Sequence, residues 1–261
     1  MVPIAQTIVD DLDHGHASSS SSVLLVTIWE LGEAAGPLFI APLSELYGRY
    51  PVINIANALF TAFTVLSALS PTTSILIFAR ALTGVAVATN VLSPAIVGDI
   101  FVSEMRGGAM SLIQLAPLIG GAAGPAIAGA VAQTLGWRKT LWMSAALAGA
   151  CEVAFLMCFR ETYRVEILKR KAARLRRETG NSALRSEFDV EEGGHSWQLI
   201  GESVLRPFIV LKSSFALQIL ALFGSFTFTY FYIMSTSLPP ILQQYYDFTP
   251  AATGLAFLTF S

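Results

Sequence analysis

Long apolar runs separated by short polar turns dominate this sequence. A helix needs about 20 mostly apolar residues to cross the roughly 30 Å hydrocarbon core of a bilayer. Five runs of this length follow one another in the first 160 residues, and a sixth comes after a long polar interval: Val23–Pro42, Val52–Leu69, Ser74–Val97, Met110–Leu135, Leu141–Phe159 and Phe215–Leu238. The pattern predicts an all-α, polytopic transmembrane helical bundle.

The turns between consecutive runs are short, such as Ser-Pro-Thr-Thr at 70–73 and Gly-Trp-Arg-Lys at 136–139. Short connections make neighbouring helices antiparallel, which favours a compact bundle. Both ends of the sequence carry partial runs. Residues 1–11 are typical of the exit of a helix, and Ala251–Ser261 opens a further run that covers about half a crossing.

Composition supports a membrane protein. Apolar residues make up 54% and charged residues 13% of the chain, where a soluble domain carries roughly 25% charged residues. Cys151 and Cys158 lie in one apolar run, which favours small-residue packing over a disulfide framework or a zinc site. His14 and His16 have no companion ligands in their Ser-rich loop, so we expect no metal and no cofactor.

The basic residues give the orientation of the bundle. If the loop over 43–51 is cytoplasmic, the same side holds all but three of the 16 Lys and Arg residues, namely all but Arg80, Arg138 and Lys139. Cytoplasmic loops carry an excess of Lys and Arg, so this orientation is the expected one.

A polar interval divides the chain. We expect an N-terminal bundle over 1–160, a cytoplasmic loop over 161–206 and the start of a second bundle over 207–261. The interval opens with a basic stretch, Arg164–Arg177, whose apolar residues recur at helical spacing: Val165, Leu168, Ala172 and Leu175. Such a helix is suited to lie on the anionic inner leaflet of the bilayer. The acidic, Gly-containing stretch Glu187–Gly194 predicts a mobile linker, with a regulatory docking site as the alternative.

The connection between the first two complete runs reads Pro-Leu-Ser-Glu-Leu-Tyr-Gly-Arg-Tyr-Pro over 42–51. Gly48 allows a tight reversal, Arg49 supplies a fixed cation, and Glu45 can pair with it or with a neighbouring cation. The loop resembles a motif of the major facilitator superfamily, in the form found in fungal drug:proton antiporters. Three residues depart from the generic motif but suit this subgroup: Ala41, Leu46 and Tyr50. The resemblance implies a loop that latches two bundles together on the cytoplasmic side.

Two further elements agree with that family. Asp99 and Arg106 bracket the next cytoplasmic turn, as the family's acidic and basic partners of the first loop do. The sequence Arg-Glu-Thr-Tyr at 160–163 resembles the Pro-Glu-Thr-Tyr that ends the sixth helix of fungal drug transporters. Sugar porters carry Pro-Glu-Ser-Pro-Arg there, so the match disfavours a sugar carrier.

The fourth family helix carries Arg-Ala-Leu-Thr-Gly from Arg80 to Gly84. An Arg inside a span costs at least about 2.5 kcal/mol on insertion scales unless it faces protein or water. The element resembles the Arg-x-x-x-Gly of the family, where the Arg is implicated in proton coupling. Snorkelling of Arg80 to the outer surface is the alternative.

The fifth family helix carries Gly-Gly-Ala-Ala-Gly-Pro-Ala-Ile-Ala-Gly over 120–129. Small residues one turn apart let a neighbouring helix approach closely, and a proline removes one backbone hydrogen bond. The run resembles the Gly-x-x-x-Gly-Pro-x-x-Gly-Gly antiporter motif, with Ala128 in place of one glycine. The matching residues are Gly120, Gly121, Gly124, Pro125 and Gly129. Generic small-residue packing is the alternative.

Three carboxylates fall inside apolar runs. Glu30 and Glu33 lie three apart, hence on one helix face, and Glu152 lies in the sixth family helix. Ionisable groups at such depths usually face a cavity or a partner, and we take them with Arg80 as candidates for proton coupling or the substrate cavity. Structural roles stay open for all three.

Aromatic residues and Met234 crowd the sixth run and are candidates to line a site for planar apolar molecules, or else to face lipid: Phe226, Phe228, Tyr230, Phe231 and Tyr232. Tyr245 and Tyr246 are expected in the following loop as interfacial anchors.

The resemblance covers nearly the whole chain, from the end of family helix 1 to the start of helix 8. A full member has twelve helices, or fourteen in a sister group. It implies proton-coupled antiport of small organic molecules, with protons, substrate and the lipid bilayer as partners, in the plasma membrane. No enzyme activity, nucleic-acid partner or ATP-binding loop is expected. A non-transporting membrane sensor and an inactive truncated remnant on the same fold are the alternatives.

Overall fold

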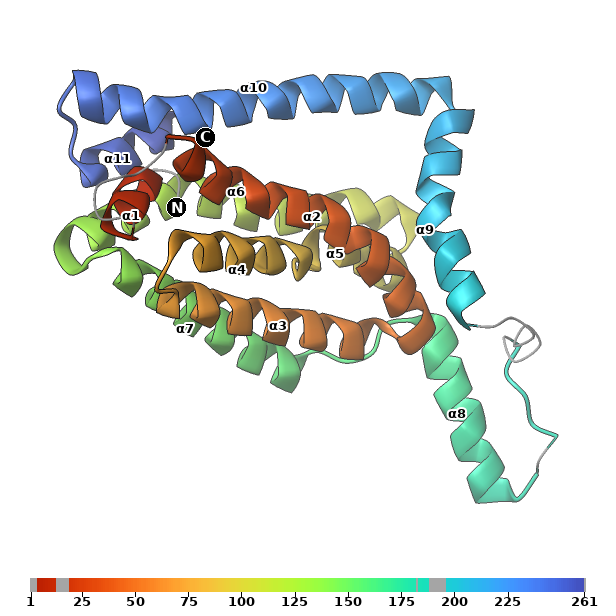
Figure 1. The fold of residues 1–261 in the computed structure, drawn as a ribbon. Coiled ribbons are helices and arrows are strands. Elements are labelled where there is room, and N and C mark those ends of the chain that lie inside the picture. Colours follow the sequence, from red (N-terminus) through yellow and green to blue (C-terminus); the bar gives the residue numbers. More distant parts are fainter. Residues whose placement is uncertain (1–3, 13–18, 182, 188–195, 261) are drawn as a thin grey trace.

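The computed structural model describes residues 4–12, 19–181, 183–187 and 196–260. Every regular element in these ranges is helical (Figure 1). In chain order the helices are α1 (Ala5–Leu12), α2 (Ser19–Tyr47), α3 (Arg49–Leu69), α4 (Thr73–Val85), α5 (Thr89–Ile100), α6 (Ser103–Leu135), α7 (Trp137–Cys158), α8 (Arg164–Thr179), α9 (Ser196–Ser213), α10 (Phe215–Tyr245) and α11 (Pro250–Phe260).

Five described helices are long and apolar enough to cross a membrane, namely α2, α3, α6, α7 and α10. The predicted all-α bundle of membrane-spanning helices is therefore confirmed. Several helices extend beyond the apolar runs from which they were predicted. Helix α10 continues through Tyr245, which was expected in a loop.

The apolar run predicted as one helix over 74–97 is interrupted. The chain forms two helices there, α4 and α5, separated by a turn over 86–88. Val87 N–H donates to the Gly84 carbonyl at 3.0 Å, which tightens the end of α4 into a turn. The turn itself holds neither glycine nor proline, and Pro94 lies further on, inside α5. Hydropathy does not register such a break because both helices and the turn are apolar.

Helices α2 and α4 pack closely through glycines. A Cβ atom built on Gly32, Gly36 or Gly84 would lie 2.4 Å or less from a backbone oxygen of the facing helix. Real Cβ atoms essentially never come so near, so any side chain at these positions would push the helices apart. The backbone contact holds Trp29 of α2 against α4.

Two apolar clusters lie along the bundle. One gathers at the end that holds α1 and includes Ile8, Leu25, Leu76 and Trp137. The other lies toward the opposite end and includes Ile40, Ile53 and Leu92. The indole N–H of Trp137 also donates to Asp11 at 2.9 Å, which ties α1 to α7.

Helices α8 and α9 lie at the end of the bundle that carries the loop between α2 and α3, and they run across the long axes of α3 and α10 (Figure 1). In α8, Ala172 is buried and Val165 and Leu168 are half-buried, whereas Leu175 is 37% exposed. Two pairs lie along its surface, Arg170 with Glu166 and Arg174 with Glu178.

Cys151 and Cys158 are free, and both are exposed on α7 and not packed against the described helices. His14, His16 and most of the stretch predicted to be a mobile linker, over 187–194, lie outside the described residues.

Candidate functional site

Arg49 is the centre of a polar cluster at the start of α3. Its side chain is almost fully buried, with 6% of the residue exposed. The guanidinium donates from Nε to the Asp99 carboxylate at 3.3 Å and from Nη1 to the Ser44 hydroxyl. It also lies over the ring of Tyr163, 5.0 Å from the ring centroid. The cluster therefore joins α2, α3, α5 and the segment after α7.

Glu161 holds that segment to α3 through backbone groups. Its carboxylate accepts from the N–H groups of Arg49 at 2.9 Å and Tyr50 at 3.1 Å. It also accepts from the N–H groups of Thr162 at 3.0 Å and Tyr163 at 2.9 Å. The first N–H groups of a helix have no partner within the helix, and a negative charge there is favourable. One side chain thus caps α3 and fixes the exit from α7.

Gly48 makes room for this arrangement. Its φ is +94°, a conformation that residues with a side chain rarely adopt. A Cβ atom at Gly48 would also lie 2.3 Å from an oxygen of Glu161. Burial raises the pKa of the Tyr163 phenol, and nearby Glu45 adds to the shift. Tyr163 therefore stays neutral at physiological pH.

The predicted loop residues are not all equivalent. Arg49 pairs with Asp99 and not with Glu45, whose side chain is exposed. Arg106 donates to the carbonyls of Phe101 at 3.1 Å and Gly98 at 3.0 Å, so it caps the end of α5. Arg106 therefore orders the turn that carries Asp99, while Arg49 makes the ion pair.

A second cluster lies within the spanning helices. Arg80 of α4 and Glu30 of α2 are close enough for a favourable charge interaction. The Tyr232 hydroxyl of α10 lies near the Glu30 carboxylate, and Glu33 lies near enough to Glu30 for their charges to repel. The Arg80 guanidinium is 5.8 Å from the ring centroid of Trp29. This cluster joins α2 and α4 to α10.

Arg80 is incompletely satisfied in this cluster. Its Nε atom is buried and has no hydrogen-bond partner among the described residues. A buried guanidinium donor without an acceptor is costly. The arrangement leaves a donor for a group that the described residues do not supply.

Glu152 lies elsewhere. It is buried in α7, 8% exposed, beside a cavity of about 270 Å³. The cavity wall includes Asn57 and Thr61 of α3 and the turn over 86–88 between α4 and α5. One carboxylate oxygen has no partner among the described residues. The structure therefore groups Glu30, Glu33 and Arg80, and it separates Glu152 from them.

The glycine-proline run of α6 meets α11. A Cβ atom on Gly129 would lie 2.3 Å from the Pro250 carbonyl oxygen, and one on Gly254 would lie 2.4 Å from the Pro125 carbonyl oxygen. The two helices therefore cross with their backbones in contact, which small residues permit. Gly254 contributes to the crossing as directly as the motif residues do.

The other glycines of this run do not contact another described helix. No described atom lies within 4 Å of a Cβ atom built on Gly120, Gly121 or Gly124, leaving chain neighbours and the helix's own nearby backbone aside. Gly121, Pro125 and Gly129 follow one another at about one-turn spacing along α6. Pro125 and Gly129 lie at the close approach to α11, whereas Gly121 does not.

Most aromatic residues of α10 face outward. Phe226, Phe228, Tyr230 and Phe231 are exposed, whereas Tyr232 is half-buried and contacts Glu30. From the sequence alone, a run of aromatic residues does not show which side chain faces the neighbouring helices. The sequence likewise gave no role to Glu161, Trp29 or Gly254. Glu161 belongs to the Arg-Glu-Thr-Tyr sequence at 160–163 that resembles the family. The resemblance pointed to this position but not to the contacts that Glu161 makes.

These features define a class: an integral, multi-pass membrane protein of bundled helices, with buried charges between helices and a polar cluster at one end. A sequence profile described as Major Facilitator Superfamily matches residues 1–261. The chain therefore belongs to the major facilitator superfamily of transporters.

Several fungal proteins are similar to this chain. It is 35% identical to efflux pump radE of Floropilus chiversii, over 99% of the chain and 49% of that protein. It is 36% identical to the MFS-type transporter penM of Penicillium rubens, over 94% of the chain and 48% of that protein. For the MFS-type transporter atr4 of Stereocaulon alpinum the identity is 37%, over 90% of the chain and 42% of that protein. The chain spans about half the length of these relatives.

A solved structure has the same fold. The crystal structure of the human organic anion transporter MFSD10 (TETRAN) matches with a TM-score of 0.58 and 20% sequence identity, over 98% of this chain and 59% of that chain. The fold of the predicted family is thereby confirmed.

Proposed function

We propose that the natural protein carrying this sequence is a proton-coupled antiporter of the fungal plasma membrane that exports small organic molecules by alternating access. The observation that supports the proposal is the proximity of Glu30 to both Arg80 and Tyr232. Charged groups of the proposed first bundle are thus near the first long helix of the proposed second bundle. The efflux pump among the fungal relatives supports the direction of transport.

The net charge of this cluster provides a basis for coupling proton binding to substrate binding. Glu30, Glu33 and Arg80 together carry one net negative charge when all are ionised. An unbalanced charge within the membrane is costly, so a bound proton or a bound organic cation stabilises the cluster. The two then compete for the same carboxylates, and exchange of one for the other is antiport. Glu152 would bind a proton apart from this cluster.

The polar cluster around Arg49 supports a gate on the cytoplasmic side. The pair with Asp99 and the cap by Glu161 fix the ends of α2, α3, α5 and α7 relative to one another. We propose that Glu45, Gly48, Arg49, Asp99 and Arg106 form this gate. The crossing of α6 and α11 at Gly129 supports the antiporter motif as the second contact between the bundles.

The direction of α8 supports a place at the membrane surface. The helix runs across the axes of the spanning helices (Figure 1), and its last turn is basic, with Arg176 and Arg177. We propose that it lies along the anionic inner leaflet.

Replacement of Arg80 by Ala tests the coupling. We expect Arg80→Ala in the natural gene product to abolish efflux driven by an imposed pH gradient in liposomes, because the carboxylates lose their buried counter-charge. Membrane insertion should be unchanged. Lys139→Ala, which removes an exposed cation of the outer side, is the control and should transport normally.

Ethidium leaving preloaded liposomes is the readout. Normal proton-driven efflux by Arg80→Ala would remove this residue from the mechanism. If the unaltered protein showed no proton-driven efflux of any tested compound, the non-transporting sensor would be the better description.

A further inference from the structure

The last turn of α8 places two arginines just before an exposed hydroxyl. Arg176, Arg177 and Thr179 lie in this turn, and Gly180 follows it in the left-handed conformation, with a φ of +67°. The side chains of Arg177 and Thr179 are exposed. Figure 1 shows this end of α8 pointing away from the spanning helices. A soluble protein on this side of the membrane can therefore reach the turn.

The spacing of charge and hydroxyl singles out this threonine. Among all Ser and Thr residues of the sequence, only Thr83 and Thr179 have a Lys or Arg three positions earlier. Thr83 is 1% exposed inside α4, where an enzyme cannot bind it. Thr140 follows two basic residues directly, but it is 4% exposed. Thr179 thus combines a basic approach with an accessible hydroxyl.

Charges next to a hydroxyl decide which kinases accept it. Protein kinases discriminate between substrates by patterns of charge around the target. Guanidinium groups two and three residues before Thr179 fit a substrate groove lined by carboxylates, to which they donate charge-assisted hydrogen bonds. The Thr179 hydroxyl itself donates to the Leu175 carbonyl at 2.7 Å, so the last turn must open for phosphoryl transfer. Helix ends open at little cost in free energy.

Helix α8 carries the positive charge on which a phosphate would act. Its residues include seven Lys or Arg and two Glu, which gives a net charge of +5. A phosphate ester adds a charge of about −2 at neutral pH, which leaves about +3. Basic segments are attracted to anionic lipid through their charge, and phosphorylation weakens that attraction. A phosphate on Thr179 would therefore weaken the attachment of α8.

We propose that Thr179 is a phosphorylation site for a Ser/Thr kinase that recognises basic substrates, and that the phosphate releases α8 from the anionic inner leaflet. The hydroxyl oxygen forms a bond to the γ-phosphorus of ATP while the bond from that phosphorus to the β,γ-bridging oxygen breaks. ADP leaves, and the hydroxyl proton passes to the catalytic carboxylate of the kinase. The inference goes beyond export and rests on the surface position proposed for α8.

The site is tested on the purified natural gene product with ATP, Mg²⁺ and the catalytic subunit of cAMP-dependent protein kinase, which selects arginines before its target. Mass spectrometry should locate a phosphate on Thr179, and the Thr179→Ser variant should also be modified. Joint replacement of Arg176 and Arg177 by Ala should slow the reaction more than about tenfold. Arg206→Ala removes an exposed cation from α9 and is the matched control, which should react at the normal rate.

Release is measured by hydrogen–deuterium exchange of the α8 amides in the full protein. The protein is reconstituted into vesicles of phosphatidylcholine alone and of equal parts phosphatidylcholine and phosphatidylserine. Before phosphorylation, exchange should be slower in the anionic vesicles. Phosphorylation should raise the rate there about 10- to 30-fold, because the phosphate offsets the attraction of about two basic residues. Thr179→Ala treated with the kinase should keep the slow rate.

Absence of phosphate on Thr179, or a rate that ignores the loss of both arginines, would overturn the site. Phosphorylation that leaves exchange unchanged, or speeds it equally in both kinds of vesicle, would overturn the release. Exchange that is alike in both before phosphorylation would reject the surface position of α8 and the release with it. Modification and release in a protein without proton-driven efflux would reject the export function and leave this inference standing.

Discussion

At the scale of single residues, Glu161 shows how much one carboxylate can organise. It accepts four backbone N–H groups and so joins the start of α3 to the exit of α7. Hydrogen bonds to charged groups contribute more than neutral ones, and unpaired N–H groups are costly when a partner is removed. The residue therefore matters more to the shape of this end of the bundle than its half-buried position suggests.

Replacement of Glu161 by Gln should lower the free energy of unfolding by about 2 kcal/mol, because an amide has one acceptor oxygen and presents N–H donors to N–H donors. Thermal unfolding of the purified protein in detergent measures the effect. Glu166→Gln is the control, since Glu166 pairs with exposed Arg170 on α8 and should contribute no more than about 1 kcal/mol. Equal losses in the two variants would contradict the capping role of Glu161.

Tyr232 is the residue through which α10 reaches Glu30. Tyr232→Phe removes the hydroxyl and keeps the ring, so we expect slower proton-driven efflux with normal insertion. Tyr230→Phe, on the exposed side of the same helix, should have no effect. Rates of ethidium efflux from liposomes at several pH values compare the two. The same pH profile in both variants would exclude Tyr232 from coupling.

At the scale of elements, backbone contacts between helices decide which glycines matter. Gly129 and Gly254 lie where α6 and α11 touch, while Gly124 faces no described neighbour. A substitution at the crossing must separate the helices, and the same substitution one turn away need not. Substitutions on the two faces of the glycine-rich run are therefore expected to have different effects.

Gly129→Leu should disrupt the crossing of α6 and α11 and reduce transport strongly. Gly124→Leu should leave folding of the described helices unchanged, because a Cβ atom there meets nothing within 4 Å. Thermal stability and efflux, measured on both variants, separate packing from function. Transport that is unchanged in Gly124→Leu would remove this residue from the antiporter motif, and stability lost there would contradict the open face.

Helix α8 allows a separate test. A peptide spanning residues 161–181 should bind vesicles of phosphatidylserine far better than vesicles of phosphatidylcholine, and added salt should weaken the binding. Each exposed basic residue contributes about 1 kcal/mol at an anionic surface. Exchange of Lys171 and Arg177 for Glu should therefore abolish the preference. Equal binding to both vesicle types would contradict the surface position.

At the scale of the whole molecule, α10 and α11 approach helices that come much earlier in the chain. Helix α11 crosses α6 with the two backbones in contact, and the Ala251 N–H donates to the Gln133 side chain at 3.3 Å. Tyr232 of α10 lies near Glu30 of α2. Under the proposed alternating access, these are the contacts that change when the two groups of helices move relative to each other. The Glu30–Arg80 cluster therefore lies near α10, whereas the Arg49 cluster and Glu152 lie among the earlier helices.

The sequence alone determined the class of protein, because burial in lipid requires long apolar helices and such runs are visible without a structure. It also singled out Arg80 and Glu30 as candidates, because charges are rare in spans. Arg49 and Asp99 were singled out through the resemblance of their loops to a known family. The sequence did not show which of these residues pair.

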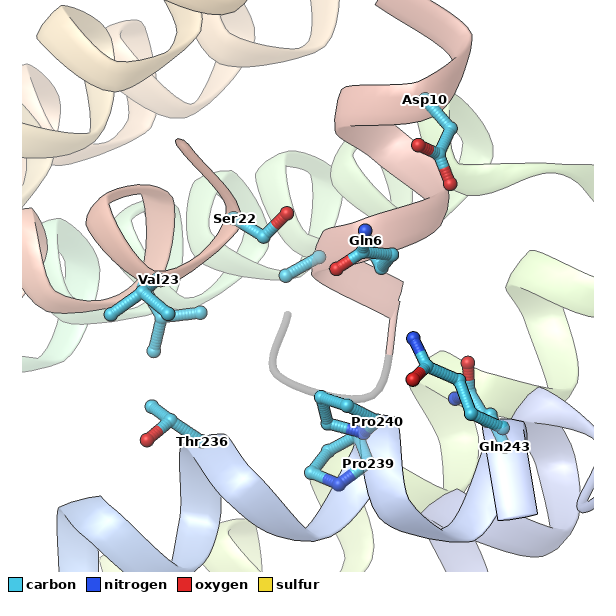
Figure 2. A pocket seen from close by; sticks show the side chains of 11 residues that line it. Gln6, Asp10, Ser22, Val23, Thr236, Pro239, Pro240 and Gln243 are labelled. Carbon is cyan, nitrogen blue, oxygen red and sulfur yellow. The ribbon is translucent and has the colours of Figure 1, made fainter. Parts of the chain in front are cut away.

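Only the tertiary structure decided which groups touch. The break between α4 and α5, the four N–H groups on Glu161 and the separation of Glu152 from Arg80 depend on helix rotation and backbone distance. A hydropathy pattern has no information on either quantity, because apolar residues cover every face of a helix in lipid. A pocket of about 470 Å³ likewise exists only where α1, α2 and α10 converge (Figure 2).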